Sequence, residues 1–435
     1  MLSTPLLILS FAVGNAAFLV PQSFAPLHGL PSHCPNNNII AKLQAAESVI
    51  IGKIILDKYG PPTIDDDDGS VTIGGGGPQA AWGAAAALQV REYMSYAAKK
   101  ETKNIGDATI KDDDLIQSIP DHLITFLAPI GTKNWTPEMT KQLSELLPPM
   151  VNIILAPSAD HITPTINIWH DEKENVKWMP VDGSFDSVGA DGLWQNRPSA
   201  QDILRAIETN DCENNIDIII HAIVESGSKP TGQGLDALPF FDDKLMSRIS
   251  TVGIEPIVFA DDVSGNVTCE DSHAVETKLR RIRQSFSGAQ ATRDEGTKGD
   301  GLFIATPDRP CYEGMVSHTN FKAGQEVDVM ENNYIEMIIR DGGNGCFTDE
   351  MKMPAATLQT GDKAPLNPTG AGNAFSAAYT VCRGTGSSAE EAASLATAVG
   401  AVVCEYEHLP PWSLDVIERM VEAAREVQHK NNILQ

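Results

Sequence analysis

Short apolar runs alternate with helical stretches along most of this chain, and that order limits the fold more than any other feature. The predicted strands are Val49 to Ile51 continuing through Ile54 to Leu56, Ile124 to Leu127, Val151 to Leu155, Ile216 to Ile223, Pro256 to Phe259 and Ile335 to Ile339. The predicted helices are Ala80 to Ala98, Pro137 to Leu147, Ala200 to Glu208 and Ala274 to Phe286. In several strands the residues that point to either face of the sheet are apolar, which is typical of strands covered by helices on both faces. The order predicts an α/β fold with a doubly wound, mostly parallel sheet.

Two segments depart from this order. Thr165 to Trp169 and Val176 to Met179 flank a charged turn, and their apolar/polar alternation predicts an antiparallel hairpin. Such a hairpin would add a small lid, near residues 160–182, to the parallel sheet. Residues 287–326 are rich in Gly, Thr and charged residues, so the sequence assigns no structure to this insertion.

The strongest chemical signal is the run NPTGAGN at residues 367–373, which leads into a helix of small residues. Gly370 and Gly372 let the backbone turn tightly and expose consecutive N–H groups. Those groups and the positive end of the following helix together form an anion site. The alternative is a tight helix start packed against a neighbour, because a GxG pattern alone is weak.

The surroundings of this run favour a nucleotide pocket. Upstream, the predicted strand ending at Ile339 runs into a glycine-rich turn at residues 340–347. Downstream, Ala392 to Glu405 reads as an alanine-rich helix with almost no charge, which predicts burial.

A second constellation lies near the N-terminal end. Asp57 is predicted at the end of the first strand, and Gly74 to Gly77 precede a helix. Four glycines allow close approach of the backbone to a ligand, and a carboxylate beside them suits sugar hydroxyls. The alternative for Asp57 is a turn residue. The patterns GxxxxGK[ST], GxGxxG and HExxH do not occur, so the common NTPase, dinucleotide and zinc-protease sites lack their residues.

Together these residues resemble the PfkB (ribokinase-like) carbohydrate kinase family, patchily from about Glu47 to Leu414, with the most specific match at Thr369 to Phe375. The resemblance implies ATP-dependent phosphorylation of a hydroxymethyl group on a sugar or nucleoside, with Mg²⁺. It assigns substrate binding to Asp57, Gly75, Gly76 and Gly77. It assigns the anion hole to Gly370, Ala371 and Gly372, and the position of the family's base to Asn373. It assigns nucleotide binding to Gly342, Gly343, Gly345, Thr369 and Thr397.

The resemblance also implies a metal-ordering motif. Asn333-Tyr334-Ile335-Glu336 matches the family's N-x-x-E pattern, so Asn333 and Glu336 are expected to act on magnesium through its waters. The family normally has a helix between this motif and the next strand, whereas Glu336 runs directly into Met337. Either the match is chance or a segment is missing there.

The chain departs from the family at its most specific motif. The family's base is an Asp, and an amide at Asn373 cannot accept the proton. The leading Asp is replaced by Asn367, which puts a monovalent-cation site in doubt. An Asn at residue 373 is similar to a divergent fungal-type branch of the family. Three readings remain open: an active kinase in which Asp341 or Asp362 replaces the base, a pseudokinase with a regulatory or assembly role, or a structural member without a working pocket.

Charge and cysteine spacing limit the partners. The formal net charge of −26 repels nucleic acid and anionic membranes, which leaves a small-molecule substrate as the expected partner. The seven cysteines are scattered and never spaced C-x-x-C, so they form neither a disulfide framework nor a zinc site. In the PfkB family, lid edges often pair between subunits, which makes a homodimer a further expectation.

The first 45 residues read as a targeting leader and residues 46–430 as the kinase-like domain. An apolar run from Leu6 to Val13, followed by small residues to Ala17, predicts a signal peptide of about 17 residues that is too short to span a bilayer. The segment after it lacks acidic residues to about Lys42. This resembles the two-part leader of algae with secondary plastids. Plastid targeting is therefore predicted, with a secreted or cytoplasmic location as the alternatives.

Overall fold

The computed structural model describes residues 48–59, 71–103, 124–170, 176–181, 201, 203–204, 218–225, 242–257, 269–291, 301–319, 335–348, 350–359 and 369–434. All of them belong to one compact unit that spans Gln44–Gln435. The predicted leader at residues 1–45, most of the predicted helix from Ala200 to Glu208, and Asn333 lie outside the described residues.

The main sheet has seven strands in the order β11-β10-β9-β8-β1-β4-β5, and every pair in it is parallel. The strands are β1 (Ser48–Ile51), β4 (Ile124–Gly131), β5 (Val151–Ser158), β8 (Ile218–Glu225), β9 (Ile249–Ile257), β10 (Leu302–Ala305) and β11 (Glu336–Met337). The predicted doubly wound, mostly parallel α/β sheet is confirmed.

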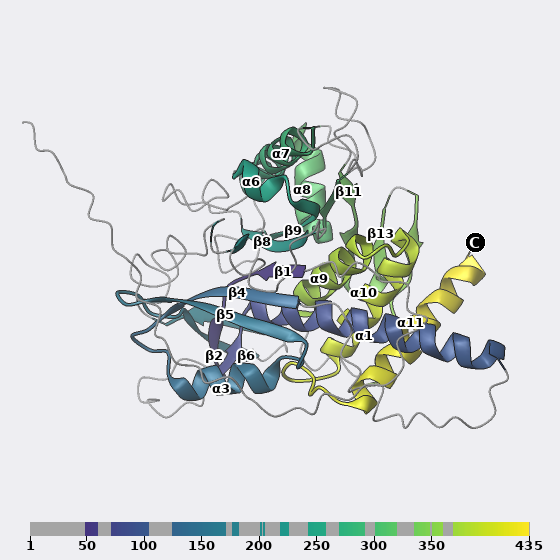
Figure 1. Cartoon of the computed structure of the whole chain (residues 1–435), viewed down its shortest axis with the longest axis horizontal. Helices are drawn as coiled ribbons and strands as arrows, with labels where there is room; N and C mark the ends of the chain where they lie inside the picture. The colour runs from purple at the N-terminus through teal and green to yellow at the C-terminus, as the bar shows by residue number, and fades with distance from the viewer. Residues whose placement is uncertain are drawn as a thin grey trace, which may run out of the picture. The chain divides into compact units, whose positions relative to one another are not determined.

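Helices cover both faces of this sheet. The described helices are α1 (Gly76–Lys103), α3 (Pro137–Leu146), α6 (Asp243–Met246), α7 (Cys269–Ala291), α8 (Arg309–Thr319), α9 (Ala371–Gly384), α10 (Ala389–Cys404) and α11 (Leu414–Leu434). Of these, α11 packs on α10 and α1. In Figure 1, α6, α7 and α8 lie on the other side of β8 and β9 from α9, α10 and α1. The strands serve both layers, because Ile50 packs in the core with α1 and α9 whereas Val49 and Ile51 pack in the core with α7. Among the described helices, none has the length and apolar character that crossing a bilayer requires.

Two smaller sheets complete the fold. The first has the order β3-β2-β6-β7 and the second the order β12-β13-β14. Their strands are β2 (Ile55–Tyr59), β3 (Val71–Gly74), β6 (Thr165–His170) and β7 (Val176–Pro180), and β12 (Ile339–Arg340), β13 (Cys346–Phe347) and β14 (Lys352–Met353). The predicted hairpin is confirmed, because β6 and β7 pair antiparallel.

Three strand predictions were wrong in their extent. The single strand predicted from Val49 to Leu56 is two strands in different sheets, since β1 ends and β2 begins on either side of Gly52. A Cβ at Gly52 would lie 2.4 Å from the Cα of Gly77, so the chain passes against the start of α1 here. The strand predicted from Ile335 to Ile339 likewise divides into β11 and β12. β9 (Ile249–Ile257) begins before the predicted start at Pro256, and Val258 and Phe259 lie outside the described residues.

The stretch at residues 287–326, to which no structure was assigned, contains the end of α7, all of β10 and α8. Its strand is only four residues long and pairs in parallel with β9. β10 pairs in parallel with β11 through Ile304 with Glu336 and Ala305 with Met337. Because α8 lies between these strands in the chain, β10, α8 and β11 form a strand-helix-strand unit.

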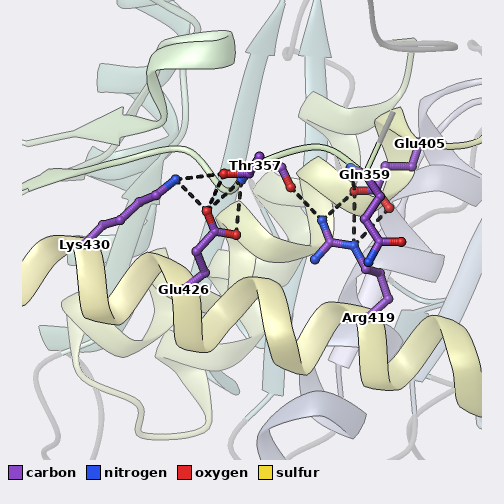
Figure 2. Close-up of polar contacts among 6 residues, drawn as sticks. All are labelled: Thr357, Gln359, Glu405, Arg419, Glu426 and Lys430. Carbon is purple, nitrogen blue, oxygen red and sulfur yellow. Dashed lines mark hydrogen bonds and ion pairs between the residues drawn. The ribbon is translucent and has the colours of Figure 1, made fainter. Parts of the chain in front are cut away.

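The C-terminal helix α11 holds the segment that follows β14. Figure 2 shows Glu426 and Lys430 bound to Thr357, while Arg419 bridges Thr357 and Glu405. The Arg419 guanidinium donates to the Thr357 carbonyl at 2.6 Å and pairs with Glu405 at 2.6 Å. Both side chains of this ion pair are almost fully buried, at 10% and 7% exposure.

We expect Arg419→Met to lower the free energy of unfolding by about 3 kcal/mol, because it leaves the buried Glu405 charge without its partner. Urea denaturation measures this loss. Lys141→Met, which removes the exposed ion pair with Glu145, is the control and is expected to cost less than about 1 kcal/mol. Adding Glu405→Gln to Arg419→Met should recover part of the loss, and equal small effects of Arg419→Met and Lys141→Met would contradict the prediction.

Candidate active site

The start of α9 and the start of α1 meet, which brings together the two glycine motifs singled out in the sequence. The Asn373 amide lies 2.6 Å from the Gln79 side chain, across 294 residues of sequence. A Cβ at Gly370 would lie 2.1 Å from the Gln79 side chain, and a Cβ at Gly76 would lie 3.2 Å from the Asn373 amide nitrogen. One site therefore contains both motifs.

Gly370 allows α9 to begin at this point. It is the N-cap of the helix and has a φ of 89°, in the left-handed region that favours glycine. Its carbonyl accepts the first helical hydrogen bond, from the N–H of Ala374, at 2.9 Å. The N–H groups of Ala371, Gly372 and Asn373 precede that bond, and at a helix start such groups and the helix dipole favour an anion.

Arg340 adds a formal positive charge to this end of α9. A Cβ at Gly372 would lie 1.9 Å from Nη1 of Arg340, so the guanidinium occupies the space that the absent side chain leaves. Two contacts fix it there. Nε donates to the Thr306 carbonyl at 3.0 Å, and Nη1 pairs with Glu255 at 2.9 Å. Arg340 was not predicted as a site residue, although an arginine between a buried strand and a glycine turn was the available signal.

Glu255 lies behind the anion site, near the C-terminal end of β9. It is 1% exposed, and burial raises the pKa of its carboxyl to about 7, although the neighbouring Arg340 charge acts in the opposite direction. Glu255 was not predicted as a site residue either. A glutamate inside an otherwise apolar strand was the signal that could have identified it.

The Asn373 amide has two orientations in this environment. In one, its nitrogen donates to the Gln79 oxygen and its own oxygen faces the carboxylate of Glu255. In the other, its nitrogen lies 3.1 Å from each oxygen of Glu255 and its oxygen lies 2.6 Å from Oε1 of Gln79, so the Gln79 amide turns as well and its nitrogen donates to Asn373. The hydrogen-bond network decides between the two orientations. An ionised Glu255 accepts only, and therefore favours the second orientation.

A pocket of about 230 Å³ opens beside this contact. It is lined by Asp57, Val71, Thr72, Ile73, Gly74, Gln79, Gln142, Leu146, Thr369, Val403, Tyr406, Glu407, His408 and Leu409. The pocket thus joins β2, β3, the first turn of α1 and the residue before Gly370.

Asp57 lies on the pocket wall but not at the end of the first strand, where it was predicted. It lies within β2, paired with Thr72 of β3, because the chain changes sheets after Ile51. A Cβ at Gly74 would lie 1.9 Å from Oδ2 of Asp57, so the carboxyl packs directly on the glycine backbone. Burial raises the pKa of Asp57 to about 7.

Gly75, Gly76 and Gly77 form the turn from β3 into α1, and of the glycine run only Gly74 lines the pocket. Gly75 has a φ of 90° and lies against the backbone of Lys53 and Ile55. These glycines therefore let the helix start close to the chain after β1.

The predicted nucleotide residues divide between two places. Gly342 and Gly343 lie in the exposed 3₁₀ turn η4 (Gly342–Asn344), and Gly345 packs on the backbone of Met353. The next residue, Cys346, has its sulfur 3.6 Å from the buried hydroxyl of Thr397 in α10, so this turn and α10 are adjacent as expected. Thr369 lies instead on the wall of the pocket that contains Asp57.

Glu336 is not brought together with the anion site. Its carboxylate accepts from Tyr379 at 2.6 Å and from Arg383 at 2.6 and 2.7 Å. These residues follow Asn373 by six and ten positions in α9, which places them about 9 and 15 Å along the helix axis. Asn333 lies outside the described residues. Within the part of the chain that the structure describes, no group of three or more His, Cys, Asp or Glu could hold a metal ion.

No family model matches the sequence, and no curated protein is similar enough to it to count as a relative. Among solved structures, a nucleoside kinase of Methanocaldococcus jannaschii, an archaeal member of the ribokinase family, is 16% identical with a TM-score of 0.48, covering 87% of this chain and 99% of that one. An uncharacterised sugar kinase of Pyrococcus horikoshii has 13% identity and a TM-score of 0.49, covering 88% and 99%. Arabidopsis thaliana ribokinase complexed with ribose and ATP has 12% identity and a TM-score of 0.43, covering 87% and 99%. Identities of 12–16% and TM-scores below 0.5 leave the function of this chain to be argued from its own residues.

Proposed function

We propose that this protein is an ATP-dependent kinase that transfers the γ-phosphoryl group to a hydroxymethyl group of a sugar or nucleoside. One observation carries the proposal. The contact between Gln79 and the first turn of α9 joins a pocket containing a buried carboxyl to a helix start that can bind an anion. A phosphoryl transfer needs those two features side by side, since acceptor and phosphate must be held in line.

Each part of the site has a role in this reaction. Asp57 accepts hydrogen bonds from the acceptor's hydroxyls on the pocket wall, while the N–H groups at the start of α9 and the Arg340 charge stabilise the phosphoryl oxygens. The acceptor oxygen bonds to the γ-phosphorus as the bond to the β–γ bridging oxygen breaks, and ADP leaves. Asn373 cannot take the hydroxyl proton, which therefore passes to a phosphoryl oxygen or to water late in the transfer.

Magnesium enters this proposal with the nucleotide. Mg²⁺ in kinase sites is usually bound by substrate phosphates, waters and one or two carboxylates rather than by a protein cage. When bound, the ion would neutralise charge on the phosphates. Asp341 lies next to the η4 turn and Asp308 is an exposed residue after β10, so either offers the type of ligand that Mg²⁺ takes.

The second candidate is a pseudokinase that binds nucleotide or sugar without turnover. The amide at Asn373 favours it, because loss of a general base removes a rate factor on the order of 10²–10⁴. ADP production separates the two functions. With magnesium and ATP, we expect turnover on at least one member of a panel of sugars and nucleosides. Binding of ATP and an acceptor without ADP production would favour the pseudokinase.

We expect ATP with magnesium to stabilise the protein by about 2.7 kcal/mol at 100 times its dissociation constant. Gly372→Ala should abolish this gain, since a methyl group there displaces the Arg340 guanidinium from Glu255 and Thr306. Thermal denaturation with and without nucleotide measures both. Gly288→Ala is the matched control, because it lies in α7 and a Cβ there meets nothing within 4 Å. Equal stabilisation of both variants would place the nucleotide elsewhere.

Asp57→Asn should raise KM for the acceptor about 10- to 100-fold, since hydrogen bonds to a charged group contribute about 1.5–3 kcal/mol. With its pKa raised to about 7, Asp57 is mostly protonated at pH 6 and mostly ionised at pH 8. The ionised form accepts hydroxyl hydrogen bonds more strongly, so KM of the natural protein should fall as pH rises across this range. Steady-state kinetics at pH 6, 7 and 8 test this.

The Asp57→Asn variant should lose this pH dependence, whereas Asp243→Asn in α6, on the other face of the sheet, should keep it. A KM that rises with pH in the natural protein would contradict the assignment of Asp57.

A further inference from the structure

Glu255 and Asn373 form a matched pair of one acid and one amide. The carboxylate of Glu255 is buried at the end of β9, and its two oxygens each lie 3.1 Å from the position that the Asn373 nitrogen takes in one orientation. In that orientation the Asn373 oxygen is turned toward Gln79 on the pocket wall, and the Gln79 amide turns with it so that its nitrogen faces that oxygen. The opposite orientation would set the amide oxygen against an ionised carboxylate.

Arg340 keeps Glu255 in this position. Its Nη1 pairs with Glu255 at 2.9 Å while its Nε is fixed on the Thr306 carbonyl at 3.0 Å. The same guanidinium fills the space beside Gly372. The carboxylate is therefore held between a fixed cation and the Asn373 side chain, and it is closed off from direct contact with a substrate.

We propose that Glu255 is a positioning residue, which accepts hydrogen bonds from the Asn373 amide nitrogen and so presents the Asn373 oxygen to the acceptor hydroxyl. This rests on the proposed kinase function. The Asn373 oxygen then accepts a hydrogen bond from the hydroxyl and orients it, without taking the proton. Asp341 and Asp362 were the carboxylates considered from sequence as substitutes for the missing base. Asp341 pairs with Arg309 at 3.0 Å and Asp362 lies outside the described residues.

The pair also accounts for an amide at residue 373. A carboxylate there would stand about 3 Å from that of Glu255, and two carboxylates so close cannot both ionise. Exchanging the groups, as Glu255→Gln with Asn373→Asp, keeps one acid, one amide and the hydrogen bond between them. The exchanged pair places the acid on the side of the pocket.

A double-variant cycle tests the proposal on Glu255→Gln, Asn373→Asp and the combination, with kcat, KM and thermal stability measured for each. We expect Glu255→Gln to lower kcat roughly 10- to 100-fold, because a misplaced orienting group costs that much. Asn373→Asp alone should lower the melting temperature at pH 8 and should not raise kcat. The combined variant should recover stability over Asn373→Asp and exceed the kcat of Glu255→Gln at least tenfold.

Glu276→Gln is the matched control, because it removes another buried carboxylate paired with an arginine, in α7 on the other face of the sheet. It should lower stability and leave kcat within about twofold of the natural protein, as expected for a residue outside the site. Additive effects of the two site variants, or a higher kcat for Asn373→Asp alone, would overturn the proposal. No turnover in any of the four proteins overturns the proposed function, and with it the role of Glu255 in a reaction. The stability cycle then still decides whether Glu255 holds Asn373.

Discussion

The close approach of α1 and α9 is the contact on which the candidate site depends. Gly83 of α1 has no side chain, and a Cβ there would lie 2.3 Å from the carbonyl oxygen of Ala374. Only glycine at that position lets the helix backbones come so near. Buried alanines continue the contact on both helices, at Ala80, Ala81, Ala84, Ala87, Ala377 and Ala378. Because the helices pack this closely, their first turns meet, and Gln79 reaches Gly370 and Asn373.

The parts of the fold that could be predicted are those in which local pattern and tertiary burial agree. The apolar strands of the main sheet, the alanine-rich helices and the β6–β7 hairpin have such patterns. The break between β1 and β2 has none, because an uninterrupted apolar run looks the same whether it serves one sheet or two. β10 was missed because its apolar run is only four residues long and lies in a stretch rich in Gly, Thr and charged residues.

The glycines of the candidate site could be predicted from the sequence, whereas its charged residues could not. A glycine run before a helix restricts the backbone, so Gly370 and Gly372 identify a tight helix start from sequence alone. The pair of Glu255 and Arg340 joins two strands that are 85 positions apart in the sequence, and no spacing rule connects them. The pair matters because a chain with a net charge of −26 must concentrate positive charge locally to bind a phosphate. Arg340 does so at the positive end of α9. Glu255 fixes the position of Arg340 and at the same time neutralises part of the Arg340 charge.

A neutral residue at position 373 is compatible with phosphoryl transfer when position and charge, rather than proton removal, carry the rate. The transition state of this reaction is loose, so the attacking hydroxyl keeps its proton until late and most of the catalysis comes from alignment and electrostatics. In the proposed kinase, the N–H groups of α9, Arg340 and Asp57 would supply those parts. A carboxylate at residue 373 would meet the buried Glu255, and one of the two acids would stay protonated at neutral pH. A protonated acid is no better a base than an amide. The amide at Asn373 is therefore the side chain that fits a helix start already supplied with a buried acid and a fixed guanidinium.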